Sequence, residues 1–176
     1  MAIHAQQADV QPTPQKVTPA TQTINLTGSY QLNGMNEANP FAADALKTLL
    51  GTSESSKGGL KIYIGERSDK SVKKYKKFIP AQAEGYFLRI SPKEIVLAGY
   101  DERGTFYAVQ TLRQLMKNGQ LPVTDITDWP DISFRGVVEG FYGAPWSHEA
   151  RLRHLKFYGE NKMNTYIYGP KDDPYH

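Results

Sequence analysis

The chain has 176 residues, a formal net charge of +3 and no cysteine. Apolar residues make up 39% of it and charged residues 22%, which are values typical of globular domains, and no apolar run is long enough to span a bilayer. Without cysteine there are no disulfides, thiol nucleophiles or thiolate zinc sites, and the mild charge gives no reason to expect a nucleic-acid partner.

Residues 1–22 are rich in Gln, Pro, Thr and Ala, a composition that predicts a flexible N-terminal arm. The arm has no basic region followed by an apolar run, so we expect no intact secretory signal. A chain whose signal has been removed would look the same and would be periplasmic or secreted. The sequence does not otherwise predict a location.

Residues 23–130 predict an α+β domain in which helices cover a single sheet. Asn39 and Gly51 are typical cap residues around the first helix, and Ser91–Lys93 joins two alternating apolar runs into a hairpin. The strands are expected at 24–32, 60–64, 85–90, 94–99 and 121–129, and the helices at 40–50, 69–79 and 105–117. We place the domain boundary at Pro130.

The second of these helices, within DKSVKKYKKFI, carries five lysines. Its apolar spacing predicts a basic amphipathic helix, and we interpret the lysines as a solvated face. A nucleic-acid or membrane patch is the less favoured alternative, because arginines and aromatic residues that recognise phosphates or bases do not alternate with the lysines.

Residues 131–176 predict a strand, helix, strand unit with parallel strands. Val137 and Val138 suit a short strand buried on both faces, Ser147 is a helix N-cap, and residues 163–168 form the second strand. A stripe of Leu152, Leu155 and Tyr158 should pack the helix on the sheet. The loops that follow the two strands should lie at the same edge of the sheet.

Two histidines of this helix, His148 and His154, have no cysteine or carboxylate at metal-ligand spacing. We interpret them as surface residues. We therefore expect neither a metal site nor a cofactor.

The first of these loops lies within RGVVEGFYGAPW, in which an apolar run changes to glycines around two aromatic residues. Taken alone, it is equally typical of a tight aromatic turn and of a loop that contacts a ligand. Together with MNTYIYGPKDDPYH, it resembles the start of the catalytic barrel in the β-N-acetylglucosaminidases of glycoside hydrolase family 84, which include bacterial O-GlcNAc hydrolases. The segment from GYFLRI to the Asp-Trp-Pro turn is similar to the α+β domain that precedes this barrel and that of family 20 hexosaminidases.

The resemblance implies a hydrolase that removes terminal β-linked N-acetylglucosamine from glycoconjugates with retention of configuration. The sugar's 2-acetamido oxygen would attack the anomeric carbon, helped by two adjacent aspartates. The substrate-binding positions of the family fall on Gly140, Phe141, Tyr142 and Lys171 of this sequence. The implied fold is the α+β domain followed by the first βαβ unit of a (β/α)₈ barrel.

The adjacent acids Asp172 and Asp173 are not matched to the family's catalytic pair, which follows a later strand. We interpret them, with Glu139, as residues that support the site. A complete barrel needs about 250 residues, so the chain is expected to be the N-terminal part of a longer enzyme, with its catalytic residues downstream and no activity of its own. The alternatives are a non-catalytic carbohydrate-binding or accessory module and an α+β interaction domain.

Overall fold

The computed structural model describes residues 9–20, 22–26, 28–51, 59–140 and 145–169. The chain divides into two compact units, Met1–Pro130 and Asp131–His176. The helices of the first unit are α1 (Pro40–Leu50), the 3₁₀ helix η1 (Lys73–Phe78) and α2 (Glu102–Leu115). Its strands are β1 (Lys16–Val17), β2 (Thr23–Asn25), β3 (Tyr30–Asn33), β4 (Leu60–Glu66), β5 (Tyr86–Ile90), β6 (Glu94–Gly99), β7 (Gln120–Pro122) and β8 (Thr124–Asp128).

Six strands of the first unit form one mixed sheet in the order β1-β8-β5-β6-β4-β3. The predicted hairpin is confirmed, because β5 and β6 pair antiparallel with Tyr86 opposite Gly99. Strands β3 and β4 run parallel to β6, and β2 and β7 form a separate antiparallel ribbon. The expected α+β domain with one principal sheet is therefore confirmed.

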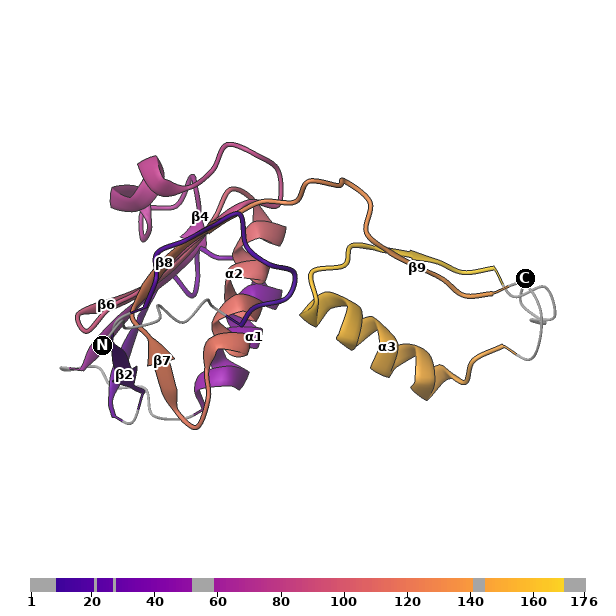
Figure 1. Ribbon diagram of the computed structural model, residues 1–176, viewed down its shortest axis with the longest axis horizontal. Helices are drawn as coiled ribbons and strands as arrows, with labels where there is room; N and C mark the ends of the chain where they lie inside the picture. The colour runs from indigo at the N-terminus through magenta and orange to yellow at the C-terminus, as the bar shows by residue number, and fades with distance from the viewer. Residues whose placement is uncertain (1–8, 21, 27, 52–58, 141–144, 170–176) are drawn as a thin grey trace, which may run out of the picture. The chain divides into compact units, whose positions relative to one another are not determined.

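Helices α1 and α2 cover one face of this sheet (Figure 1). The strands alternate strictly: Ile62, Leu88 and Leu97 point to the helices and are fully buried there. The opposite face carries a smaller cluster around Phe87 and Val96, which is covered by η1. The sheet is thus buried on both faces at its centre, where β6 lies between β5 and β4.

Both α-helices of the first unit begin at a side-chain cap. The Asn39 side chain accepts from the Phe41 amide ahead of α1, and Gly51 ends that helix at a positive φ of 70°, as predicted. Helix α2 begins three residues before the expected range, because Asp101 caps it by accepting from the Gly104 amide at 2.9 Å. The cap residue therefore fixes the start of the helix ahead of its apolar stripe.

The predicted α-helix at 69–79 is wrong: the segment forms the 3₁₀ helix η1, limited to Lys73–Phe78. The reason is its period, since in VKKYKKF an apolar residue recurs every third position and not every 3.6. A 3₁₀ helix has three residues per turn and so directs Val72, Tyr75 and Phe78 toward the sheet. The lysines between them remain on the exposed sides.

The flexible arm predicted for residues 1–22 is also wrong for its described part. Val10 is 1% exposed within the main core, and Lys16 and Val17 pair antiparallel with Thr127 and Ile126 of β8. The composition concealed this strand because it is only two residues long and its partner lies more than a hundred residues downstream. Residues 9–20 therefore complete the sheet.

The second unit is a βαβ unit made of β9 (Gly136–Val138), α3 (His148–Glu160) and β10 (Thr165–Ile167). The two strands pair in parallel, with Val138 opposite Ile167, and Ser147 caps the helix by accepting from the Ala150 amide, as predicted. Two expectations fail. Val138 is 55% exposed, and of the helix stripe only Tyr158 is buried, while Leu152 and Leu155 are exposed, because a two-stranded sheet covers little of the surface that a larger sheet would bury.

Gly104 of α2 allows the helix to approach β5, and we predict that Gly104→Ala destabilises the first unit. A Cβ atom there would lie 2.1 Å from the Gly85 carbonyl oxygen, a backbone atom that cannot turn away. Alanine favours a helix over glycine by about 1 kcal/mol, but overpacking of this kind costs roughly 1–3 kcal/mol or more, so the clash prevails. Urea unfolding followed by circular dichroism measures the difference.

Gly28→Ala is the matched control, because a Cβ atom at Gly28 has no neighbour within 4 Å. It should change the free energy of unfolding by no more than about 0.5 kcal/mol. Equal unfolding midpoints for the two variants would contradict the close helix approach.

Candidate functional site

The carboxyl ends of β9 and β10 lie side by side in the second unit. The parallel register places Val138 opposite Ile167, and the Glu139 amide continues the ladder by donating to the Ile167 carbonyl at 2.9 Å. Glu139–Gly140 and Tyr168–Gly169 therefore leave the sheet at one edge. In parallel α/β sheets this edge is where ligands bind.

Glu139 is the centre of the contacts at this edge, with only 2% of its side chain exposed. Its Oε1 accepts from Arg151 Nη2 and from the Trp146 backbone amide, both at 2.9 Å. Its Oε2 accepts from Arg151 Nε at 2.8 Å and from the Tyr166 hydroxyl. Each carboxylate oxygen thus has two donors, which satisfies its hydrogen-bonding capacity.

These donors fix the ionisation of the cluster. The Arg151 guanidinium, aided by Tyr166 and the Trp146 amide, lowers the pKa of Glu139 to about 2, although burial alone would raise it. The carboxylate in turn raises the pKa of Arg151. Burial and the adjacent carboxylate raise the pKa of the Tyr166 hydroxyl, which therefore stays protonated. At neutral pH Glu139 is ionised and fully paired, so it has no proton to donate to a leaving group.

Arg151 also reaches the start of the second loop. Its guanidinium lies over the Tyr168 ring, 4.7 Å from the ring centroid, and Nη2 donates to the Tyr168 hydroxyl at 3.3 Å. The ion pair thus connects the end of β9, the first turns of α3 and the residue after β10. Sequence analysis gave Glu139 a supporting role but missed Arg151, whose only signal was an arginine one turn into the helix after the loop.

An aromatic cluster packs beside the ion pair. The Trp146 and His154 rings meet edge to face with centroids 4.5 Å apart, and Tyr158 stacks on Tyr166 at 6.4 Å. His154 is half-buried, and its Nδ1 atom is buried without a hydrogen-bond partner. The prediction that His154 is a surface residue is therefore wrong, because it did not anticipate that Trp146 folds against the helix.

The predicted site residues divide into two groups. Glu139 and Gly140 are described: the first is buried, and the second is exposed, with open space where a Cβ atom would lie. The remaining predicted residues lie outside the described ranges and stay predictions: Phe141, Tyr142, Lys171, Asp172 and Asp173.

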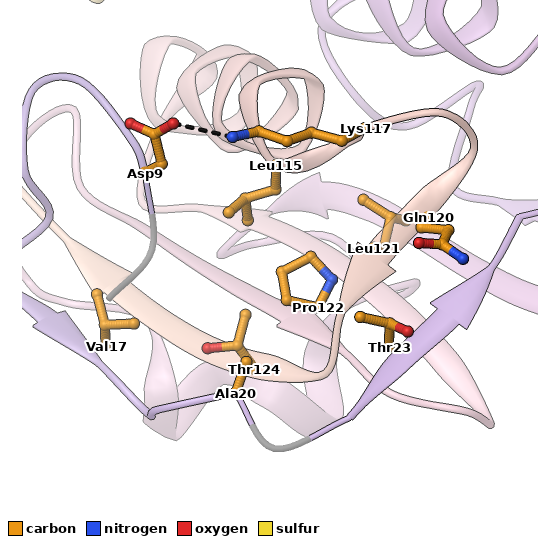
Figure 2. A pocket seen from close by; sticks show the side chains of 10 residues that line it. All are labelled: Asp9, Val17, Ala20, Thr23, Leu115, Lys117, Gln120, Leu121, Pro122 and Thr124. Carbon is orange, nitrogen blue, oxygen red and sulfur yellow. Dashed lines mark hydrogen bonds and ion pairs between the residues drawn. The ribbon is translucent and has the colours of Figure 1, made fainter. Parts of the chain in front are cut away.

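A separate pocket of about 210 Å³ lies within the first unit, between the N-terminal segment, β7 and the end of α2. Figure 2 shows Leu115 and Leu121 at its wall and the Lys117 ammonium extended to Asp9 across its rim, at 2.9 Å. Its described lining residues all belong to the first unit. Within the described ranges there is no cluster of three or more potential metal ligands, and no helix there is long and apolar enough to cross a membrane.

Each of the two units matches a known protein-family profile. Residues 7–129 match the profile described as glycosyl hydrolase family 20, domain 2, and residues 135–176 match that of β-N-acetylglucosaminidase. The solved structure of CpGH84B is similar over 96% of this chain, with a TM-score of 0.85 and 36% identity. The chain belongs to glycoside hydrolase family 84. It corresponds to the N-terminal part of such a protein, so the predicted resemblance is confirmed.

Two further proteins are similar to this family 84 chain. The structure of CpGH84D matches 96% of it with a TM-score of 0.82 and 25% identity. Protein O-GlcNAcase of Rattus norvegicus is 51% identical over 41 residues, which are 23% of this chain and 4% of that protein. The chain spans 31% of each of the two solved chains.

The depressed pKa of Glu139 predicts an acid-sensitive second unit. A carboxyl group whose pKa falls from 4.5 to about 2 on folding stabilises the folded state fully above pH 4.5, and the contribution disappears as pH falls toward 2. In a Trp129→Phe background, Trp146 is the remaining tryptophan and its fluorescence follows unfolding of this unit. The wild type should be more stable than Glu139→Gln above pH 5, and the difference should narrow between pH 5 and pH 2.

The control for the loss of one negative charge is Glu149→Gln. This change neutralises an exposed carboxylate in the first turn of α3. The variant should unfold close to the wild type at neutral pH. A stability difference between wild type and Glu139→Gln that stays constant down to pH 2 would contradict the assigned ion pair.

Proposed function

We propose that the protein to which this chain belongs is a retaining exo-β-N-acetylglucosaminidase that acts on terminal β-linked N-acetylglucosamine of glycoconjugates. The observation that carries the proposal is the edge at which β9 and β10 end together, with Gly140 exposed after the first strand and Tyr168 following the second. In the proposal, the family's sugar-binding loops begin at this edge. In the proposed site the Gly140 carbonyl accepts from a sugar hydroxyl, Phe141 and Tyr142 form walls, and Lys171 donates to another hydroxyl.

The proposed reaction is assisted by the substrate. The 2-acetamido oxygen attacks the anomeric carbon as its bond to the leaving oxygen breaks, and a carboxylic acid gives that oxygen a proton. Water, losing a proton to the carboxylate left by that transfer, then attacks the anomeric carbon. This breaks the bond between that carbon and the acetamido oxygen, opens the ring that the first step closed and restores the original configuration. The two inversions together give retention.

The acids for this reaction are proposed to lie outside the chain. Among the described residues of the second unit, Glu139 is the carboxylate that faces the edge, and its depressed pKa is the opposite of what a general acid needs. Asp172 and Asp173 are proposed to support the loop. The proposed complete protein contains a barrel that continues from β10 and carries an aspartate pair.

The 176-residue chain and the full-length protein should differ in hydrolysis of a chromogenic β-N-acetylglucosaminide. We expect turnover by the full-length protein alone. Activity in both would assign chemistry to acids of this chain, with Asp172 and Asp173 as the first candidates. Activity in neither, with retained sugar binding, would favour a carbohydrate-binding module.

Substrate assistance predicts a specific dependence on the acetamido group. Replacing its methyl hydrogens with fluorine withdraws electrons from the attacking oxygen, so kcat/KM of the full-length protein should fall by about tenfold or more for the trifluoroacetamido substrate. Parallel measurements with mono-, di- and trifluoroacetamido substrates give the dependence of kcat/KM on the number of fluorine atoms. Equal rates across this series would indicate a protein nucleophile instead.

A further inference from the structure

We propose that Glu139 and Arg151 form a positioning pair that sets the spacing of Gly140 and Tyr168, the residues at which the two proposed sugar-binding loops begin. The inference rests on the proposed function and goes beyond it, because neither residue would touch the sugar through its side chain. Instead, the pair holds Gly140 and Tyr168, the first residues of the two loops. Its contribution should therefore appear mainly in substrate binding.

One carboxylate closes the first loop. Gly140 follows Glu139 directly, and the Trp146 amide, at the far end of the same loop, donates to Glu139 Oε1 at 2.9 Å. Glu139 therefore holds Trp146 through its side chain and Gly140 through the peptide bond that joins them. Gly140 has open space around it, so the contacts of its neighbour and the ladder bond of Glu139 to Ile167 fix its backbone.

The Arg151 guanidinium connects Glu139 to Tyr168, the residue that follows β10. Arg151 binds both oxygens of Glu139 and also contacts the ring and hydroxyl of Tyr168. A planar guanidinium can meet all these partners at once because its donors point in fixed directions. A lysine ammonium at this position would keep the charge but could not bind both oxygens and lie on the ring together.

A role in stability alone does not account for this choice of residues. Buried ion pairs lose much of their attraction to desolvation, and apolar side chains of similar volume often stabilise a protein as well. An apolar pair would pack beside Tyr166 but would leave the Trp146 amide and the Tyr166 hydroxyl without acceptors among these residues. The charged pair thus specifies one arrangement of the edge.

Arg151→Lys in the full-length protein tests the pair. We expect KM for the chromogenic substrate to rise about tenfold while kcat changes little, because the change misplaces groups that bind the sugar and leaves the reacting acids in place. Glu139→Gln should show the same division between KM and kcat. Hydrogen exchange at the Trp146 amide should become faster in both variants.

Arg89→Lys is the matched control, because Arg89 binds Asp125 with the same two-pronged geometry, at 2.9 and 2.6 Å, on the sheet of the first unit. It should leave KM unchanged. A wild-type KM for Arg151→Lys, or an equal rise in Arg89→Lys, would overturn the positioning role.

The assay also separates the two proposals. If the wild-type full-length protein does not hydrolyse the substrate, the proposed function fails, and exchange at the Trp146 amide then tests the pair. Faster exchange in Arg151→Lys than in Arg89→Lys would support the pair as the anchor of the edge. Equal exchange in the two variants would overturn it.

Discussion

The second unit depends on the neutralisation of one buried carboxylate. Glu139 directly follows β9 and is 2% exposed, so its charge would be costly without compensation. Arg151 supplies the compensating positive charge. The Trp146 amide and the Tyr166 hydroxyl donate to the remaining acceptor positions of the Glu139 carboxylate. The end of β9, the Trp146 amide and helix α3 are thus joined through one side chain.

The first unit is organised differently, through apolar packing on both faces of a sheet. Its main cluster lies under α1 and α2, and its second cluster lies under η1. One buried polar group of the main cluster, the Tyr86 hydroxyl, donates to Asp128 at 2.9 Å. The contrast is one of size: a large sheet can rely on burial, whereas two short parallel strands and one helix rely on directed polar contacts.

Local signals were sufficient to predict much of this fold. Asn39, Gly51 and Ser147 marked helix ends correctly because a cap is decided by a few neighbouring residues. The hairpin of β5 and β6 was equally visible in its alternation. The 3₁₀ helix was missed because periods of 3 and 3.6 are hard to separate over seven residues.

Features that depend on distant partners could not be predicted in the same way. The two-residue strand β1 is defined by β8, and the half-buried state of His154 depends on the ring of Trp146. At the candidate site, the sequence placed Glu139 beside the ligand edge. It could not indicate which of the arginines in α3 faces that carboxylate, since this depends on the rotation of the helix against the strands.

The pairing of β1 with β8 also has a consequence for the order of folding. Lys16 lies opposite Thr127, so closing this ladder joins segments separated by most of the first unit. Contacts of such long sequence separation form late and slowly, after local hairpins and helices. Until this ladder closes, β8 presents an unpaired edge on that side, and an unpaired strand edge is where another chain can add a strand.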